Sequence, residues 1–277
     1  MSKKLEALIT DLDGSLLNDQ KGIGAQDVKT LQALQDKGVQ VFVATGRHQC
    51  LTRFYYPQLG LKTPTVTSNG GLLYDFAKEE ILSMHVISRE DVATLVDFTR
   101  RQGLVFYLYS DRLCILDPRN PNSFYYQQDK ALGVIARSDE FVEMEEGFDP
   151  LAHTVIKFMI PDCPAGAVEA LAQTDLGRSG RITWAYSGDE FLDINAGGVS
   201  KGSALRELAQ RYGFSLENTL ALGDNFNDLE MLQAVGYPVV PETAREDLRP
   251  YARYITCSNN DNPISHIVRQ LFPELLD

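Results

Sequence analysis

The chain has 277 residues, 44% of them apolar, and a formal net charge of −12 with no Lys/Arg cluster longer than a pair, so nucleic acid is not an expected partner. It lacks an apolar run of about eighteen residues and a long apolar segment near residue 1, which predicts neither a membrane span nor a secretory signal and leads us to expect a cytoplasmic protein. The four cysteines form no Cys-x-x-Cys pair and the four histidines are dispersed, which favours reduced thiols and predicts no zinc site, disulfide framework or histidine metal site.

The first predicted element is a buried strand over residues 5–10, which ends in Asp11-Leu12-Asp13-Gly14-Ser15. Alternate residues of an extended chain share a side, so Asp11 and Asp13 can face one point at the carboxyl end of the strand, where open α/β sheets bind ligands. Two carboxylates this close require a divalent cation, or else one of them has a raised pKa. Asp-Gly is also a common turn dipeptide, so this pentapeptide alone leaves a turn and a site equally open.

A helix is predicted next over residues 26–37, where apolar residues recur at the spacing of one buried stripe and Gly38 follows. Residues 39–43 then predict a strand that ends in Thr45-Gly46-Arg47, and a shorter strand over 65–67 ends in a polar, glycine-containing segment. Strand, helix and strand joined by short loops are typical of a parallel sheet.

The pattern changes between residues 85 and 189, where a helix over 88–102 precedes strands that are rich in aromatic residues. These strands are predicted over 104–109, 113–116, 153–160, 181–186 and 191–194. Their short connections suit antiparallel pairing, so we interpret this segment as an inserted α+β domain. Four of its aromatic side chains could line a pocket, but packing of one sheet face is the favoured interpretation for Tyr107, Tyr109, Trp184 and Tyr186.

The first pattern returns at Lys201, which begins a helical apolar stripe that ends at Gly213. A strand over 219–222 then ends at Gly223-Asp224-Asn225-Phe226-Asn227-Asp228, and another helix follows. The predicted fold class is therefore α/β: a Rossmann-like parallel-sheet core with helices on both faces, plus an inserted α+β domain with an antiparallel sheet. The predicted core covers residues 1–84 and 190–277, and the inserted domain covers 85–189.

Four polar motifs thus lie at one edge of the predicted sheet. Together they offer what phosphoryl transfer to a carboxylate requires: a nucleophile, a cation site, donors for the phosphoryl oxygens and an acid. In residue type and order, these motifs resemble the four signature motifs of the haloacid dehalogenase (HAD) superfamily. In this chain they are Asp11-Leu12-Asp13-Gly14-Ser15, Thr45-Gly46-Arg47, Lys201 and Gly223-Asp224-Asn225-Phe226-Asn227-Asp228. The insertion between the second and third motifs resembles that of the Cof-type sugar-phosphatase branch, which carries a C2-type cap domain.

The resemblance implies a role for each carboxylate of these motifs. Asp11 would be the nucleophile that forms an aspartyl-phosphate, and Asp13 would be the general acid and then the general base. Mg²⁺ would be held by the Asp11 carboxylate, the Asp13 backbone carbonyl and Asp224, while Asp228 would orient metal-bound water or hold Lys201. A general acid must be protonated in the first step. Partial burial beside an ionised neighbour is expected to raise the pKa of Asp13 and so to favour its protonated form.

The same resemblance implies that Thr45 and Lys201 bind the phosphoryl oxygens, with Asn227 close by, and that Asn69 and Gly70 shape the mouth of the site. The expected function is that of a Mg²⁺-dependent phosphatase for a small phosphorylated metabolite of the sugar phosphate, flavin mononucleotide or pyridoxal phosphate class. One alternative is a phosphomutase of the phosphomannomutase type, which would need several arginines in the cap. The other is a non-enzymatic phosphometabolite-binding protein.

Overall fold

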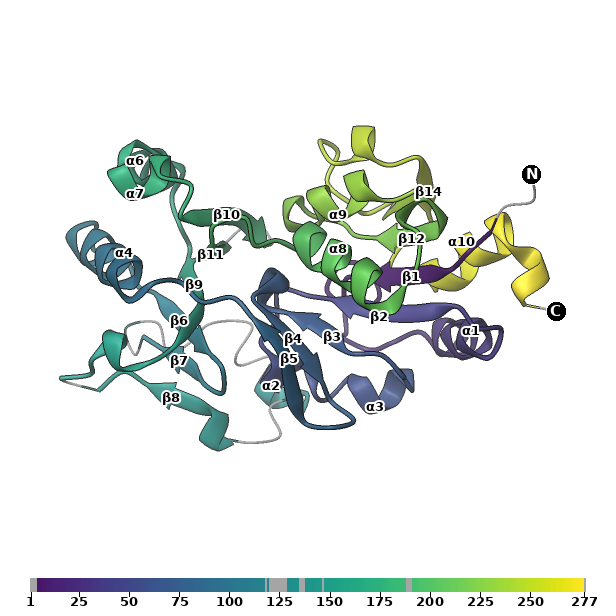
Figure 1. Cartoon of the computed structure of the whole chain (residues 1–277), viewed down its shortest axis with the longest axis horizontal. Coiled ribbons are helices and arrows are strands. Elements are labelled where there is room, and N and C mark those ends of the chain that lie inside the picture. The colour runs from purple at the N-terminus through teal and green to yellow at the C-terminus, as the bar shows by residue number, and fades with distance from the viewer. Residues whose placement is uncertain are drawn as a thin grey trace.

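Two β-sheets, one larger and one smaller, organise the chain (Figure 1). The structure is a computed structural model that describes residues 4–117, 119, 129–134, 138–145, 147–187 and 191–276. The larger sheet contains, in spatial order, β14 (Tyr254–Thr256), β13 (Tyr237–Pro241), β12 (Thr219–Leu222), β1 (Ala7–Thr10), β2 (Gln40–Ala44), β3 (Thr65–Thr67), β4 (Leu72–Asp75) and β5 (Glu80–Met84). The smaller sheet contains β10 (Ile182–Ser187), β11 (Phe191–Ala196), β9 (Val155–Pro161), β6 (Tyr107–Ser110), β7 (Cys114–Leu116) and β8 (Phe141–Glu143).

Helices connect these strands. The α-helices with assigned bounds are α1 (Ala25–Asp36), α2 (Gln49–Thr52), α3 (Tyr56–Leu59), α4 (Arg89–Arg101), α6 (Ala165–Gln173), α7 (Asp175–Arg178), α8 (Lys201–Tyr212), α9 (Leu229–Ala234) and α10 (Pro263–Leu271). No α-helix in the described ranges is long and apolar enough to cross a membrane.

Most strands of the larger sheet run in one direction. From β14 to β3 every neighbouring pair is parallel, and β4 and β5 add an antiparallel edge. β1 lies between β12 and β2, with Thr10 opposite both Leu222 and Val43. Because parallel neighbours end at the same edge of a sheet, the segments that follow β1, β2 and β12 meet there, although they come from distant parts of the sequence.

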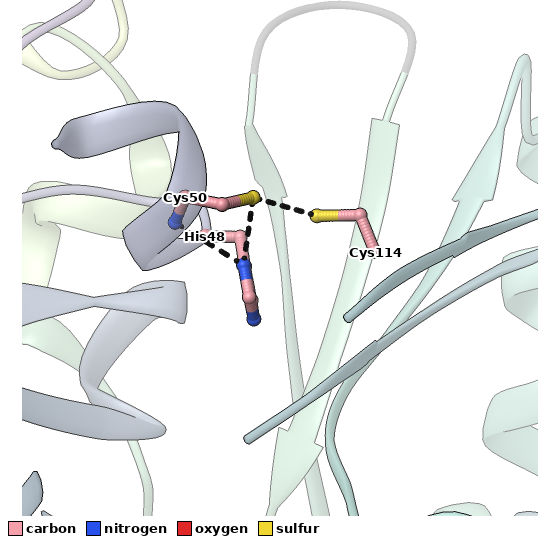
Figure 2. Close-up of side chains that lie close together, drawn as sticks. All are labelled: His48, Cys50 and Cys114. Atoms are coloured by element: carbon pink, nitrogen blue, oxygen red, sulfur yellow. Dashed lines mark hydrogen bonds between the residues drawn. The ribbon is translucent and has the colours of Figure 1, made fainter. Parts of the chain in front are cut away.

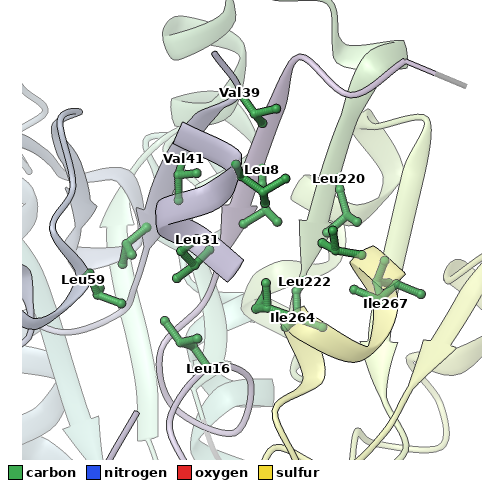
Figure 3. Close-up of a cluster of buried hydrophobic side chains, with 14 of the residues drawn as sticks. Leu8, Leu16, Leu31, Val39, Val41, Leu59, Leu220, Leu222, Ile264 and Ile267 are labelled. Carbon is green, nitrogen blue, oxygen red and sulfur yellow. The ribbon is translucent and has the colours of Figure 1, made fainter. Parts of the chain in front are cut away.

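Side chains of the larger sheet pack against helices on both of its faces. On one face, Leu8 of β1 belongs to a buried cluster with Leu31 of α1 and Ile267 of α10 (Figure 3). On the other face, Ile9 belongs to a cluster with Leu205 of α8. The opposite facing of Leu8 and Ile9 is the two-residue period of a strand, and helices on both faces are what buries a parallel sheet. The predicted fold class is confirmed.

The smaller sheet is mostly antiparallel, with β7 and β8 as a parallel pair. Leu108 of β6 shares a buried cluster with Leu95 of α4 and Leu171 of α6, so helices cover one face. The neighbouring Tyr107 belongs to a different cluster, together with Leu72 of the larger sheet. The second face of the smaller sheet is therefore directed toward the larger sheet.

One predicted boundary differs from the pairing of the strands. Residues 191–196 form β11, which hydrogen-bonds to both β9 and β10 and so belongs to the smaller sheet, whereas the predicted core resumed at residue 190. The boundary that we propose between the inserted segment and the returning core lies after Ala196.

The predicted strand over 219–222 is also followed by β13 and β14, which extend the larger sheet at its edge.

Candidate active site

Three carboxylates and one ammonium group meet at the edge of the larger sheet where β1 and β12 end. Asp11 directly follows β1, Asp224 lies just beyond β12, and Asp228 ends a 3₁₀ turn, η5 (Phe226–Asp228). One oxygen from each of the three carboxylates lies within 4.8 Å of the other two. The Lys201 Nζ atom lies 2.9 Å from Asp11 Oδ2 and 2.7 Å from Asp228 Oδ1. The fold thus brings together four of the residues that the sequence predicted to form the site.

Local hydrogen bonds hold Asp224 and Asp228 in place. Asp228 Oδ2 accepts backbone N–H bonds from Asp224 and Asn225 at 3.1 and 3.2 Å, as part of a capping box. Ser15 Oγ donates to Asp224 Oδ1 at 2.8 Å. Gly14 adopts a left-handed φ of +73°, and a Cβ atom at this position would collide with Asp224 Oδ2, so the loop after β1 requires glycine.

Burial and neighbouring charges change the pKa of Asp11, Asp224 and Lys201. Burial raises the pKa of Asp11 to about 7; the Asp228 and Asp13 charges add to this effect and Lys201 opposes it. Burial and the Asp11 charge hold the pKa of Asp224 well above its usual range. Burial acts against the charged form of Lys201, but the Asp11 and Asp228 carboxylates outweigh it and raise the pKa of this lysine. One ammonium group is too little positive charge for three buried carboxylates, and a divalent cation would supply the rest.

The donor set fits a hard cation such as Mg²⁺, because all of its side-chain donors are carboxylate oxygens. The three carboxylates do not fit equally. Both oxygens of Asp228 are already bonded, Oδ1 to Lys201 and Oδ2 to backbone N–H groups, which favours holding Lys201 over orienting metal-bound water as its role. Asp11 and Asp224 line the cavity, whereas Asp228 does not, so they are the carboxylates better placed to hold the cation.

The carboxylate of Asp13 lies outside this cluster and pairs with two cations. Arg47 donates to it from Nε to Oδ2 at 2.6 Å and from Nη2 to Oδ1 at 2.9 Å, and Lys21 Nζ lies 2.5 Å from Oδ1. Burial acts in the opposite direction, but the charges of Arg47 and Lys21 hold the pKa of Asp13 well below its usual range. The predicted rise in this pKa is therefore wrong for the present arrangement, because the nearest charged neighbours of Asp13 are cations.

Arg47 also joins Asp13 to the inserted segment. Its Nη1 donates to Asp129 Oδ2 at 2.8 Å, and the Arg47 and Asp129 side chains are both buried. Arg47 belongs to the Thr-Gly-Arg motif, but no role was predicted for it, and no motif marks Lys21 or Asp129. The Arg47–Asp129 contact depends on how the inserted segment returns to the core. The only signal in the sequence was therefore the place of Arg47 in the motif that contains Thr45.

The predicted phosphate-binding residues lie around the same point. Thr45 and Asn227 line the cavity that Asp11 lines, whereas Lys201 is buried and does not form part of its wall. Asn227 Nδ2 donates to Asn69 Oδ1 at 3.1 Å, and Asn69 Nδ2 donates to Asp193 Oδ2 of β11 at 2.8 Å. A chain of side-chain hydrogen bonds therefore connects Asn227 to the smaller sheet.

A cavity of about 360 Å³ lies between the two sheets, a size that suits a small molecule. One end carries Asp11, Asp13 and Asp224, and the opposite wall is largely apolar. The apolar wall comes from the smaller sheet and α2 and consists of Leu51, Tyr107, Tyr109, Cys114, Leu116, Phe141, Met159 and Phe191. Tyr107 and Tyr109 pack in a buried cluster, as favoured, and they also line the cavity, which was the alternative left open. Trp184 and Tyr186 pack toward the helix-covered side, as expected.

A further cation lines the cavity, on the side of the smaller sheet. Lys157 of β9 pairs with Asp193 at 2.9 Å and donates to the Gly46 backbone oxygen at 2.7 Å. Burial lowers the pKa of Lys157, and the Asp193 charge opposes this effect. The sequence did not mark Lys157, because a lysine in a strand carries no distinguishing pattern.

Known proteins resemble this chain over nearly its whole length. The sequence model of haloacid dehalogenase-like hydrolases matches residues 8–268, so the chain belongs to that family. Over 275 residues, 93% of this chain and 95% of the relative, it is 25% identical to the pyridoxal phosphate phosphatase YbhA of Escherichia coli K12. Over 293 residues, 96% of this chain and 98% of the relative, it is 25% identical to the 5-amino-6-(5-phospho-D-ribitylamino)uracil phosphatase YwtE of Bacillus subtilis 168.

A solved structure of a haloacid dehalogenase-like hydrolase from B. subtilis has the same fold. The two superpose with a TM-score of 0.82 at 22% identity, over 97% of this chain and 100% of the other. The predicted superfamily with its Cof-type branch is confirmed, and so is the enzyme class of phosphatase.

Proposed function

We propose that the chain is a Mg²⁺-dependent phosphatase that hydrolyses a small phosphorylated metabolite through an aspartyl-phosphate on Asp11. The observation that carries this proposal is the meeting of Asp11, Asp224 and Lys201 at one end of a cavity of suitable size. The family match and the two relatives named as phosphatases support the same class of reaction.

In this proposal, Asp11, Asp224 and the backbone carbonyl of Asp13 hold Mg²⁺. When bound, the cation would supply positive charge to the phosphoryl oxygens and the attacking carboxylate. A carboxylate that attacks a phosphate dianion must also overcome repulsion between like charges, and Lys201, 2.9 Å from Asp11 Oδ2, reduces it. The Leu12 backbone N–H donates to Asp11 Oδ1 at 2.7 Å and so orients the nucleophile.

Donors for the phosphoryl oxygens come from the cavity wall. Thr45 Oγ1 accepts the Arg47 backbone N–H at 3.1 Å, which leaves the hydroxyl proton available to the phosphate. Asn227 is oriented by its bond to Asn69. We assign these two side chains to phosphate binding. Lys201 does not line the cavity, so we propose that it acts on the phosphate through its ion pair with Asp11.

Proton transfer falls to Asp13 in this proposal. Its ionised form, held by Arg47 and Lys21, suits the second step, in which a base takes a proton from the attacking water. The first step needs the protonated form, so the two cations must first turn to another anion. Arg47 and Lys21 both line the cavity, and the phosphate dianion of an arriving substrate is such an anion.

The apolar wall favours a planar heteroaromatic leaving group over a hexose. The hydroxyl groups of a sugar require hydrogen-bond partners when they are buried, and Tyr107, Tyr109 and Met159 present mostly carbon and sulfur surface. An aromatic ring can stack on such side chains. Among the predicted classes we therefore propose pyridoxal phosphate, the substrate named for the E. coli relative, as the better fit.

The two alternatives have less support. A phosphomutase would need arginines from the inserted segment to hold a bisphosphate, but of the arginines that the structure describes there, none lines the cavity; Arg137 lies outside the described residues. A non-enzymatic binding protein has no need of a nucleophile such as Asp11 beside Lys201.

Phosphate release from a panel of phosphorylated metabolites, with Mg²⁺ or with EDTA, tests the proposal. We expect Mg²⁺-dependent turnover, with pyridoxal phosphate preferred over glucose 6-phosphate, and loss of activity in Asp11→Asn. Asp97→Asn is the matched control, because this carboxylate lies on α4 and is 57% exposed. Unchanged phosphate release by Asp11→Asn would show that the mechanism is wrong, and a preference for glucose 6-phosphate would contradict only the substrate class.

A further inference from the structure

A second group of metal-binding side chains lies between the two sheets, apart from the carboxylates (Figure 2). His48 and Cys50 lie at the start of α2, and Cys114 lies on β7 of the smaller sheet. His48 Nδ1 is 3.0 Å from Cys50 Sγ, and Cys50 Sγ is 3.4 Å from Cys114 Sγ. The sequence predicted neither a zinc site nor a histidine metal site, because no spacing motif joins two cysteines that lie 64 residues apart.

A hydrogen bond at Nε2 of the His48 imidazole determines that Nδ1 is the ring atom that faces the thiols. His48 Nε2 lies 2.8 Å from the backbone oxygen of Ser110. A carbonyl oxygen can only accept, so Nε2 carries a proton. The Nδ1 atom faces Cys50, with Sγ at 3.0 Å and the backbone N–H, which it accepts, at 3.4 Å. Metal-binding histidines are oriented in this same way, by donating their second N–H to a carbonyl or carboxylate.

We propose that His48, Cys50 and Cys114 form a binding site for a thiophilic divalent cation, with Zn²⁺ as its representative. Sulfur and nitrogen donors select such cations over Mg²⁺, which prefers oxygen. Zn²⁺ with two thiolates and one neutral imidazole carries no net charge. This matters because the three side chains are at most 2% exposed and belong to or adjoin an apolar cluster, where an uncompensated charge would be costly.

The donor spacing is close to the spacing that a tetrahedral Zn²⁺ requires. Zn–S bonds of about 2.3 Å place two sulfurs about 3.8 Å apart, and the Cys50 and Cys114 sulfurs are separated by 3.4 Å. The separation of 3.0 Å between His48 Nδ1 and Cys50 Sγ must lengthen by about 0.5 Å on binding. On binding, each thiol loses its proton to solvent.

The position of the site has two consequences. Three protein donors leave a fourth position, and Cys114 lines the cavity, so water from the cavity can fill it. The cation would also link the larger sheet, which α2 follows, to the smaller sheet through Cys114. A ligand that binds only the folded arrangement stabilises it, so bound Zn²⁺ is expected to raise the melting temperature.

Titration of the reduced, full-length protein with Zn²⁺ in excess Mg²⁺ tests this site without relying on activity. We expect one tightly bound equivalent, and binding weaker by about a hundredfold or more in Cys114→Ser. Asp224→Asn should keep this equivalent, because its carboxylate belongs to the other site. Cys163→Ser is the matched control, since Cys163 is a buried cysteine in a different cluster.

Co²⁺ supplies a signature that carboxylates cannot give. We expect the wild-type complex with Co²⁺ to show thiolate-to-metal charge-transfer absorption. If Cys114→Ser does not fold, this wild-type spectrum is sufficient to test the proposal. Equal Zn²⁺ affinity in the wild type and a folded Cys114→Ser, or a wild-type Co²⁺ complex without that absorption, would overturn the proposal. A Cys50–Cys114 disulfide found by mass spectrometry in place of bound metal, under reducing conditions, would overturn it as well.

Discussion

A buried carboxylate that does not line the cavity, Asp27 of α1, offers a sharp test of how burial changes the pKa of a carboxyl group in this core. Asp27 has no exposed surface, and its Oδ1 accepts the Ser265 backbone N–H at 2.7 Å at the start of α10. Burial raises its pKa to about 7, although the backbone hydrogen bonds act in the opposite direction. In the unfolded chain the same group titrates near pH 4. The stability that protonated Asp27 contributes is therefore fully present below about pH 4 and is lost as the pH rises to about 7.

Asp27→Asn keeps an oxygen that can accept the Ser265 N–H and removes the ionisation. At about 1.4 kcal/mol per pKa unit, we expect the variant to exceed the wild type in free energy of unfolding by about 1.5 kcal/mol at pH 5 and about 4 kcal/mol at pH 8. Urea unfolding followed by far-ultraviolet circular dichroism at both pH values measures this difference. A gain of the same size at the two pH values would refute the reasoning.

The control for this measurement lies on the same helix. Asp36 ends α1, and its side chain is 77% exposed. Asp36→Asn should change the free energy of unfolding by less than about 0.5 kcal/mol at either pH, because an exposed carboxylate retains its hydration on folding. A pH-dependent gain in this control would mean that the loss of a negative charge anywhere in the chain, rather than burial of Asp27, produces the effect.

Two further substitutions test the site itself. Lys201→Met removes the buried cation between two carboxylates, so we expect the free energy of unfolding in urea to fall by about 3–5 kcal/mol. We also expect kcat to fall by at least about a hundredfold. Activity within twofold of the wild type would contradict the role given to this lysine. Gly14→Ala should cost about 1–2 kcal/mol for the left-handed backbone and also weaken Mg²⁺ activation, because the added methyl group displaces Asp224. Gly38→Ala carries the same backbone cost at φ +85° with no atom within 4 Å of the new Cβ, so full activity is expected there, and equal Mg²⁺ dependence in both glycine variants would rule out the steric explanation.

The carboxylate end of the site was predictable because it depends on local patterns. Apolar runs that end in acidic or glycine-containing segments predict strands, and parallel strands end at one edge of a sheet. Asp11 and Asp224 follow β1 and β12, which are direct neighbours, so their meeting follows from strand order once the sheet is parallel. The first turn of α8 then places Lys201 between Asp11 and Asp228.

The other half of the site depends on contacts between segments that no local pattern joins. The sequence by itself determined the strands that carry the acidic motifs, those motifs, and the presence of an insertion, whereas β4, β5, β8, β13 and β14 were not predicted. Only the tertiary structure decided that Arg47 and Lys21 pair with Asp13, and that Cys114 lies against Cys50. Periodicity records which face of an element is buried, but not which distant element covers it. The charge around Asp13 was therefore decided by how the core segments after β1 and β2 meet. The His48–Cys50–Cys114 group was decided by the packing of the smaller sheet against the core.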